Sequence, residues 1–481
     1  MSKMHSKEAA ESIIGTSLSP DRTRTESLCP VCLKRLPAQR LMLDDGMYLV
    51  KRCPQHGAFQ TPIWNGSPAF NQWQRQRIPV QAPVQFTGSQ KGCPFDCGLC
   101  PNHQQRPCTI VVEVTQRCNL ACPVCYAAAP ADTPDPSPAT VAEMFRRAAQ
   151  AGPGSNIQLS GGEPTMRDDL PALVAMGRDA GFNFIQVNTN GLRLGRDRAF
   201  VKALKQAGLA SIFLQFDGVD DHVYRKLRGR DLMAEKRCAI EACAEQGIGV
   251  VLVPTLVPGI NTGQIGAILQ AALSWAPAVR GVHFQPISYF GRYSSKLTAA
   301  DRITLPEVMR AIETQSAGRF KATDLGPPGC ENALCSFHGR FIQLADGKMV
   351  PLRQPASESC GCTSVRADVA ADQAIASVAR QWASPDQLAM KNLPPIDCAG
   401  QDTADRSDKG EPSVPMGLDD FIHLARTHIF SISGMAFQDA WTLALDRVRD
   451  CCIHVITPDG RLVPFCLYNL TAADGRRLYR T

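Results

Sequence analysis

The stretch Cys118-Asn-Leu-Ala-Cys122-Pro-Val-Cys125 decides the fold, because it places three thiols on one short loop directly after an apolar run at residues 110–115. Thiolates are the ligands that iron–sulfur clusters require, and three of them leave one iron of a four-iron cluster open to another group. Three cysteines also suit an incomplete structural zinc site. The strand pattern around the motif favours the cluster, so we predict a catalytic 4Fe-4S site.

Short apolar runs alternate with amphipathic stretches on the carboxyl side of this motif. The predicted strands cover residues 110–115, 157–160, 184–188, 212–216, 250–255 and 281–285. Strands that alternate with helices form parallel βαβ units, which indicates the α/β class. We therefore predict a partial (βα)6 barrel whose ligands gather at the carboxyl ends of its strands.

Polar residues follow three of the predicted strands. The segments are Ser160-Gly161-Gly162-Glu163-Pro164, Asn188-Thr189-Asn190-Gly191 and Gln215-Phe216-Asp217-Gly218. Gln285 ends the sixth predicted strand and could also face the same space. These side chains are the expected lining of a binding pocket beside the cysteine loop.

The cysteine spacing and the SGGEP segment resemble the radical SAM superfamily. The resemblance implies that Cys118, Cys122 and Cys125 hold a 4Fe-4S cluster whose open iron binds S-adenosyl-L-methionine. It implies an enzyme that cleaves this molecule reductively to a 5'-deoxyadenosyl radical and removes hydrogen from an unactivated C–H bond. A low-potential electron donor, ferredoxin or flavodoxin, is the implied partner.

The same resemblance assigns the pocket residues. Gly161, Gly162 and Glu163 are implied to contact the methionine amino group, and glycines permit such a close approach. Asn188 and Gln215 match positions that hold the ribose and the carboxylate. An iron–sulfur electron carrier, the alternative of another class, needs no such set.

The 20 cysteines fall into tight groups, which deliver ligands to one ion or cluster and do not suggest disulfides. Cys93, Cys97 and Cys100 repeat the spacing of the central motif, which favours an auxiliary 4Fe-4S cluster over structural zinc. His103 and Cys108 are both candidates for a fourth ligand.

A second outer group lies near the N-terminus. Cys29 and Cys32, with Cys53 and His56, have the two-residue loops typical of a zinc ribbon or a rubredoxin-like iron site. We predict one structural metal ion there, with zinc and iron both open.

The last third carries the remaining groups and otherwise looks irregular. They are Cys330 with Cys335, Cys360 with Cys362, and Cys451 with Cys452, His454 and Cys466. These residues could complete one further cluster, although buried thiols are also common in protein cores. Cys238 and Cys243 lie on a predicted helix and are assigned to packing or to the surface.

The whole chain resembles a subgroup of this superfamily that includes archaeal tetraether lipid synthase and pterin-methylating proteins. The landmarks are GCPFDCGLCPNH, VHFQPISYFGR and CCIHVITPDGRLVPFCLYN. The segment PPGCENALCSFHG is closer to a bacterial branch called radical SAM (seleno)protein TrsS. Members of the subgroup transfer methyl groups or join carbon atoms, so such chemistry is the implied reaction, with oxidation or rearrangement as the alternative.

The expected organisation has five parts. They are a flexible lead (1–27), an N-terminal metal-binding module (28–90), an auxiliary cluster segment (91–108), the core (109–300) and a C-terminal auxiliary domain (301–481). The net charge of +6 shows no basic block for nucleic acid, and the longest apolar stretch, 248–257, is too short to span a bilayer. We therefore expect a cytoplasmic enzyme.

Overall fold

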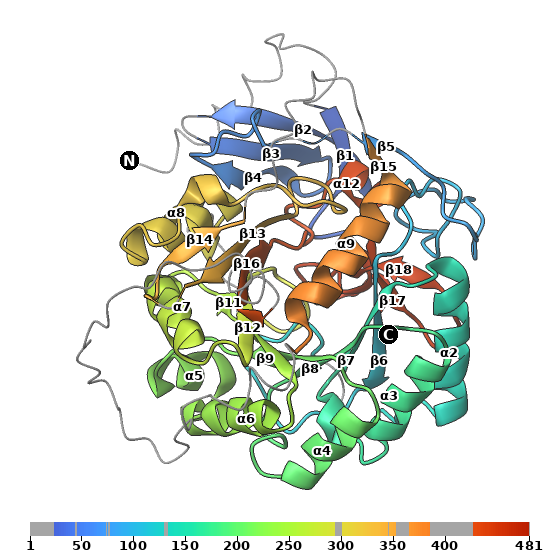
Figure 1. Cartoon of the computed structure of the whole chain (residues 1–481). Helices are drawn as coiled ribbons and strands as arrows, with labels where there is room; N and C mark the ends of the chain where they lie inside the picture. The colour runs from blue at the N-terminus through green and yellow to red at the C-terminus, as the bar shows by residue number, and fades with distance from the viewer. Residues whose placement is uncertain are drawn as a thin grey trace.

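The computed structural model of the chain describes residues 24–43, 46–73, 75, 77–128, 133–293, 301–344, 346–352, 365–384 and 427–480. A small antiparallel sheet packs beside a larger, mostly parallel sheet that is surrounded by helices (Figure 1). Most of the predicted lead, together with Cys360 and Cys362, lies outside these residues. In the ranges given, no helix is long and apolar enough to cross a membrane.

Six parallel strands in sequential order form the centre of a 12-stranded sheet. They are β6 (Thr109–Thr115), β7 (Asn156–Gly161), β8 (Ile185–Thr189), β9 (Ser211–Gln215), β10 (Gly249–Val253) and β12 (Val279–Pro286). All six lie within two residues of the predicted strands, and β6 and β10 show the near-continuous apolar runs of parallel strands buried on both faces. The predicted α/β class with its partial barrel is confirmed.

Helices connect these strands and cover the outer face of the sheet (Figure 1). They are α2 (Pro138–Ala151), α3 (Leu170–Asp179), α4 (Arg198–Gln206), α5 (Asp221–Arg228), α6 (Met233–Glu245) and α7 (Ile265–Ser274). In α2, Val141, Phe145 and Ala148 form the buried stripe, and Ser137 caps the helix by accepting a bond from the Thr140 amide.

The C-terminal third extends this sheet at both edges, so the expectation of irregular structure there is wrong. The strands are β13 (Ser336–Gln343), β14 (Met349–Pro351), β16 (Ile429–Met435), β17 (Ile453–Ile456) and β18 (Leu462–Pro464). β16 pairs parallel with β12, and β17 pairs parallel with β6. β16 alternates Phe430 and Ile432 with Ser431 and Ser433, so it lacks the apolar run that marks the central strands.

The described residues also include four further α-helices and three short strands. The helices are α8 (Leu305–Gln315), α9 (Ala367–Trp382), α12 (Leu445–Arg449) and α13 (Phe465–Tyr468). The strands are β11 (Thr255–Leu256), which pairs with β12, and the pair β5 (Arg77–Ile78) and β15 (Val365–Arg366). α9 contacts β10, β12 and β16, and Trp382 at its end packs on Phe213 of β9. This helix therefore forms a wall of the space inside the barrel.

The N-terminal sheet has the order β1-β2-β3-β4, with β1 (Arg24–Leu28), β2 (Arg35–Leu43), β3 (Gly46–Cys53) and β4 (Gly57–Asn65). Polar contacts fasten it to the C-terminal segment. Arg40 Nη2 donates to both oxygens of Asp446 at 2.7 Å, and the buried Lys51 Nζ donates to the Ala440 carbonyl at 2.7 Å. The N-terminal sheet and the segment around Ala440 and Asp446 therefore pack together.

Candidate functional site

A cavity of about 380 Å³ lies inside the curve of the central strands. Its lining runs from Thr109 and Asn156, at the beginning of their strands, to Glu163, just beyond the carboxyl end of β7. The three thiols of the central motif line the same cavity. The carboxyl ends of the strands therefore place the cysteine loop and the predicted pocket residues in one space, which we call the chamber.

The thiols of Cys118, Cys122 and Cys125 lie on the loop after β6. Backbone amides donate to two of them: the Leu120 amide to Cys118 Sγ and the Ala128 amide to Cys125 Sγ, each at 3.4 Å. All three side chains line the chamber. Three thiolates from one loop are a donor set that fits a four-iron cluster with one iron open to another group.

Glu163 ties the strand-end loops together. Its Oε1 accepts from the hydroxyls of Thr165 and Thr189, both at 2.6 Å, and its Oε2 accepts from the Asn190 amide at 2.7 Å. The side chain is 1% exposed and yet lines the chamber. A methionine amino group at this carboxylate would thus join a set of bonds that already fixes its position.

The two glycines before Glu163 have a structural reason of their own. A Cβ on Gly161 would lie 2.0 Å from the Thr115 carbonyl oxygen, and a Cβ on Gly162 would lie 2.2 Å from that of Arg117. The Gly162 amide donates to the Thr115 carbonyl at 2.8 Å. Glycine therefore lets the end of β7 contact the start of the cysteine loop directly.

Arg228, at the end of α5, is a chamber residue that the sequence analysis missed. Its guanidinium makes two bonds to the buried Asp217 carboxylate, at 2.6 and 2.7 Å, and a third to the Val124 carbonyl at 3.1 Å. Gln215 lies against the same guanidinium, toward which hydrogen bonding orients its amide oxygen. The sequence did offer a sign of this role, because Arg228 is the last residue of the helix that follows Asp217, just beyond the carboxyl end of β9.

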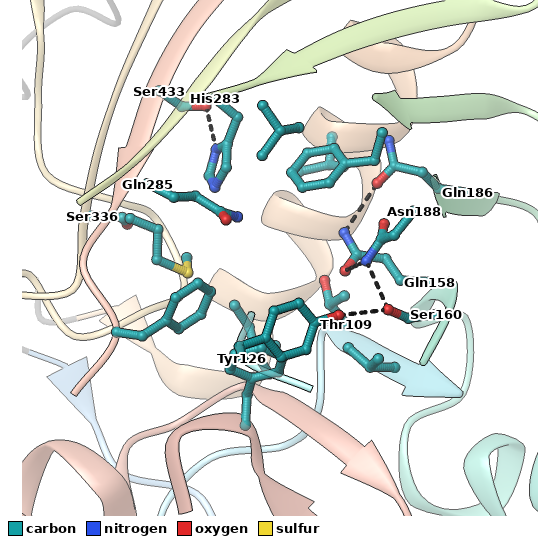
Figure 2. A pocket seen from close by; sticks show the side chains of 18 of the residues that line it. Thr109, Tyr126, Gln158, Ser160, Gln186, Asn188, His283, Gln285, Ser336 and Ser433 are labelled. Carbon is teal, nitrogen blue, oxygen red and sulfur yellow. Dashed lines mark hydrogen bonds between the residues drawn. The ribbon is translucent and has the colours of Figure 1, made fainter. Parts of the chain in front are cut away.

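A chain of hydrogen bonds between uncharged side chains runs along the chamber wall from the cysteine loop into the barrel (Figure 2). The Tyr126 hydroxyl bonds Ser160 Oγ at 2.9 Å, and Asn188 Nδ2 donates to Ser160 Oγ at 3.4 Å. Gln158 Nε2 donates to Gln186 Oε1 at 3.0 Å. Burial raises the pKa of Tyr126 to about 12, so its hydroxyl remains protonated at neutral pH.

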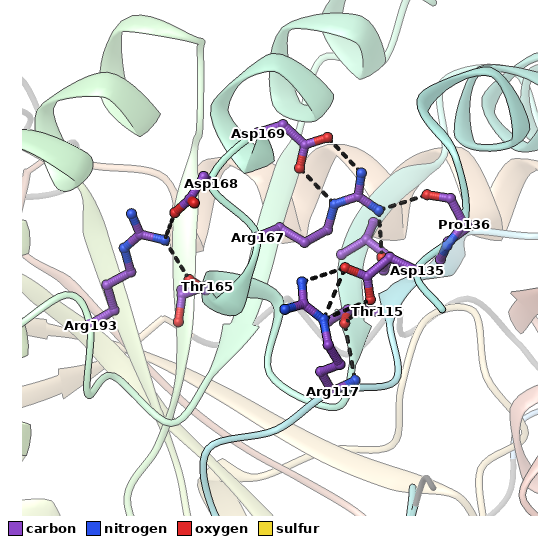
Figure 3. Close-up of polar contacts among 10 residues, drawn as sticks. Thr115, Arg117, Asp135, Pro136, Thr165, Arg167, Asp168, Asp169 and Arg193 are labelled. Carbon is purple, nitrogen blue, oxygen red and sulfur yellow. Dashed lines mark hydrogen bonds and ion pairs between the residues drawn. The ribbon is translucent and has the colours of Figure 1, made fainter. Parts of the chain in front are cut away.

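Ion pairs hold the outer side of the cysteine loop (Figure 3). Arg117 pairs with Asp135 at 2.5 Å, and Asp135 also accepts from the Thr115 hydroxyl. Arg167 pairs with Asp169 at 2.6 Å and donates to the Val114 carbonyl at 2.9 Å. The ends of β6 and β7 and the connector before α2 are therefore joined by side chains outside the chamber.

The N-terminal group forms a compact metal site. Ligand atoms of Cys29, Cys32, Cys53 and His56 all lie within 4.8 Å of one another. His56 Nδ1 lies 3.5 Å from Cys29 Sγ and 3.4 Å from Cys53 Sγ. Three thiols and one imidazole at this spacing suit one tetrahedral ion.

Cys108, Cys330 and Cys452 form a second compact group, and all three are buried. They come from the start of β6, the loop before β13 and the start of β17. Ala371 of α9 packs against them, and Thr109, Glu331 and Ile453, each next to one of these cysteines, line the chamber, so the group lies just behind the chamber wall. Cys108, left open as a fourth ligand for the Cys93 group, thus belongs to another group.

The remaining thiols are less compact. Cys93, Cys97 and Cys100 are buried and line a small cavity with His103, whose Nε2 bonds the Cys451 carbonyl at 2.8 Å. Burial raises the pKa of the Cys451 and Cys466 thiols, and the nearby Cys335 adds to the rise in both. Cys452, next to Cys451 in sequence, belongs to the compact group with Cys108 and Cys330.

Two family models match this chain. The Radical SAM superfamily matches residues 112–272, and the HMPTM N-terminal zinc ribbon domain matches residues 22–65. The first region carries Cys118, Cys122 and Cys125, and the second carries the N-terminal group of three cysteines and His56.

Individual proteins match as well. The 7,8-dihydro-6-hydroxymethylpterin dimethyltransferase of Methanocaldococcus jannaschii is 34% identical over 476 residues, which cover 93% of each chain. The GTP 3',8-cyclase of Edwardsiella ictaluri is 33% identical over 34% of this chain and 50% of its own. The crystal structure of Streptococcus suis SuiB matches 41% of this chain and 44% of its own, with 18% identity and a TM-score of 0.35, too weak a likeness to carry an argument.

Proposed function

The chain belongs to the radical SAM superfamily, in the family of the M. jannaschii pterin dimethyltransferase, and from this premise we propose that it transfers methyl groups to carbon atoms of a pterin-like ring. The relative aligns over 93% of both chains, so the similarity includes the outer cysteine groups as well as the barrel.

The chamber residues divide the work of such a reaction. When bound, the 4Fe-4S cluster and S-adenosyl-L-methionine supply a 5'-deoxyadenosyl radical that removes a hydrogen atom from a C–H bond. Cys118, Cys122 and Cys125 would hold the cluster. Gly161, Gly162, Glu163 and Gln215 would hold the methionine and ribose, an assignment supported by their positions along the chamber. Asn188, which the resemblance gives to the cofactor, has an amide oxygen without a bond within the described residues, and this oxygen is left for the substrate. The surrounding apolar side chains exclude water from the radical.

The outer thiols support a multi-cluster enzyme. The Cys108 group lies just behind the chamber wall, since Thr109, Glu331 and Ile453 line the chamber, and this position suits an electron-relay role. Cys93, Cys97 and Cys100 would be ligands of a further cluster, and the reaction needs a low-potential reductant such as ferredoxin or flavodoxin. For the N-terminal group we propose zinc, because three cysteines and a histidine within one ribbon fit its tetrahedral preference.

One observation carries the proposal: a single cavity joins the three thiols to a wall of uncharged amides and hydroxyls. An isoprenoid chain, as in the tetraether branch, would leave the remaining bonding capacity of this wall unused, including the unpaired Asn188 Oδ1, whereas a pterin-like ring offers it donors and acceptors.

The test uses the full chain, reconstituted with iron and sulfide without oxygen and reduced with dithionite. Reductive cleavage leaves the methyl group of S-adenosyl-L-methionine on methionine, so the assay also contains a separate one-carbon donor, either excess S-adenosyl-L-methionine or a methylene-tetrahydrofolate, and dithionite supplies the electrons. We expect 5'-deoxyadenosine, and in the presence of that donor mass spectrometry should detect one or two added methyl groups on 7,8-dihydro-6-hydroxymethylpterin. If 5'-deoxyadenosine forms and the ring is oxidised or rearranged without added methyl groups, the enzyme carries out the alternative radical reaction and the methyl-transfer proposal is wrong. A complete cluster without any 5'-deoxyadenosine would favour an electron carrier.

A further inference from the structure

The wall of the chamber opposite the polar chain carries a second set of uncharged groups. His283 and Gln285 are two residues apart on β12, so both point to the same face, and both extend into the cavity (Figure 2). Among the described lining residues, the charged side chains Glu163 and Arg228 lie beside the thiols. Arg75, Arg77 and Glu331 lie near Cys330. The space between His283 and Asn188 is therefore uncharged.

The imidazole of His283 is held in one orientation. Its Nδ1 lies 2.8 Å from Ser433 Oγ, on the residue that pairs with it in the neighbouring strand β16. The rings of Phe213 and Trp382 flank it, with centroids at 5.3 and 5.9 Å. Because a serine hydroxyl can donate or accept, Nε2 can act as either acceptor or donor toward the cavity.

This imidazole is neutral at working pH. Burial lowers the pKa of His283 to about 4, and the side chain is 7% exposed. Within the part of the chain that the structure describes, no residue bonds its Nε2. A neutral ring nitrogen at the surface of a cavity is a hydrogen-bonding group that a ligand can satisfy.

Asn188 offers the complementary group on the opposite wall. Its Nδ2 is used by Ser160 and Gln158, but its Oδ1 is buried and lacks a hydrogen-bond partner within the described residues. A buried acceptor without a partner is costly and marks a place where a ligand donor fits. The two walls therefore present His283, Gln285 and Asn188 toward one space.

We propose that His283, Gln285 and Asn188 form a recognition subsite for the edge of a flat, uncharged heterocycle with both hydrogen-bond donors and acceptors, and that Ser433 positions the imidazole. A charged ligand would lose its hydration without an opposite charge, and a purely apolar ring would leave all three polar groups unpaired. This inference rests on the proposed function, because it names the residues that would select the ring to be methylated.

Equilibrium dialysis of the reconstituted full chain tests the subsite. The probes are 7,8-dihydro-6-hydroxymethylpterin, guanine and naphthalenemethanol, an apolar ring of similar shape. We expect the pterin to bind more tightly than naphthalenemethanol. His283→Phe keeps a flat ring but removes both nitrogens, so its Kd for the pterin should rise about 10- to 100-fold. His222→Phe, at an exposed position of α5, is the matched control and should keep the wild-type Kd.

Ser433 provides a second test that a folding defect cannot imitate. Ser433→Ala removes the hydroxyl that orients Nδ1 and should raise the Kd, whereas Ser433→Thr restores a hydroxyl and should recover most of the affinity. If His283→Phe does not retain the iron content of the wild type, the comparison of Ser433→Ala with Ser433→Thr alone decides whether the subsite exists. A Kd that Ala and Thr change equally would overturn the positioning role.

The outcomes separate the subsite from the proposed function. A pterin that is methylated by the wild type and bound by His283→Phe within about twofold of the wild-type Kd overturns the subsite and leaves methyl transfer intact. Binding of guanine that depends on His283, without binding or methylation of the pterin, supports the subsite and refutes the pterin substrate. If the wild type binds neither heterocycle, the subsite is wrong.

Discussion

Arg228 shows how one side chain can organise the radical site. It is 7% exposed, faces a carboxylate with no exposure, and bonds the backbone of the cysteine loop at Val124. A buried charge that loses its partner is far more costly than an exposed one, because the remaining charge has neither water nor an opposite charge. The Asp217–Arg228 pair therefore stabilises the loop only while both members are present.

The first prediction compares two arginines of one helix. Arg228→Ala leaves Asp217 buried and unpaired, so it should lower the free energy of unfolding by about 3–5 kcal/mol. Arg225→Ala breaks an exposed pair with Asp231, 56% and 62% exposed, and should cost about 0–1 kcal/mol. Urea midpoints of the two variants give the comparison, and equal shifts would contradict it.

The second prediction concerns the open iron. Cys118→Ala removes one of three cluster ligands, so 5'-deoxyadenosine formation should fall to background while zinc and the other iron remain bound. Cys238→Ala, on the half-buried face of α6 and outside every thiol group, is the control and should retain activity. Product formation by Cys118→Ala, measured by liquid chromatography, would refute the cluster assignment.

Single residues also show where sequence reasoning ends. Cys118, Cys122, Cys125 and Glu163 were recognised because short motifs carry their spacing. His283 has no such signal, since its role depends on Ser433, which is 150 residues away in sequence and adjacent only after β16 pairs with β12. A single sequence does not reveal which histidine a distant serine will orient.

At the scale of elements, the turn after β7 depends on glycine. The third prediction is that Gly162→Ala disrupts the site, because its Cβ would lie 2.2 Å from a backbone oxygen that cannot move without shifting the cysteine loop. We expect a cost of about 1–3 kcal/mol or more, together with loss of iron. Gly263→Ala, where a Cβ meets nothing within 4 Å, is the control. Unchanged iron in Gly162→Ala would show that the loop adapts.

The central strands were predictable for a physical reason, and α9 and the flanking strands were not. β6 and β10 are apolar over most of their length because both faces are buried, and β9 carries the apolar run 212–214. β7 and β8 alternate apolar with polar side chains, but the glycine-containing motifs SGGEP and NTNG end them. β16 alternates in the same way without such a motif, and α9 presents Ala370, Ala374 and Ser377 to the chamber, so neither carries a continuous apolar pattern.

At the scale of the whole molecule, the outer thiols join segments that are remote in sequence. Cys108, Cys330 and Cys452 connect the starts of β6 and β17 with the loop before β13. The N-terminal ribbon packs on the segment around Asp446, which precedes Cys451 and Cys452. Candidate metal ligands therefore lie where the N-terminal and C-terminal parts of the described chain meet the large sheet. The spacing of the cysteines in the sequence did not show which of them share a site.

The last prediction follows from this separation of sites. Cys108→Ser should lower iron by about four atoms per chain and leave zinc unchanged, because its group lies in the iron–sulfur part of the molecule. Cys32→Ser should lower zinc by about one atom and leave iron unchanged, since its ligands all belong to the ribbon. Elemental analysis of both variants, purified without oxygen, measures the two metals together. If Cys108→Ser lost zinc and kept its iron, the group of Cys108, Cys330 and Cys452 would hold a single ion. The proposal of more than one cluster would then rest on Cys93, Cys97 and Cys100 alone.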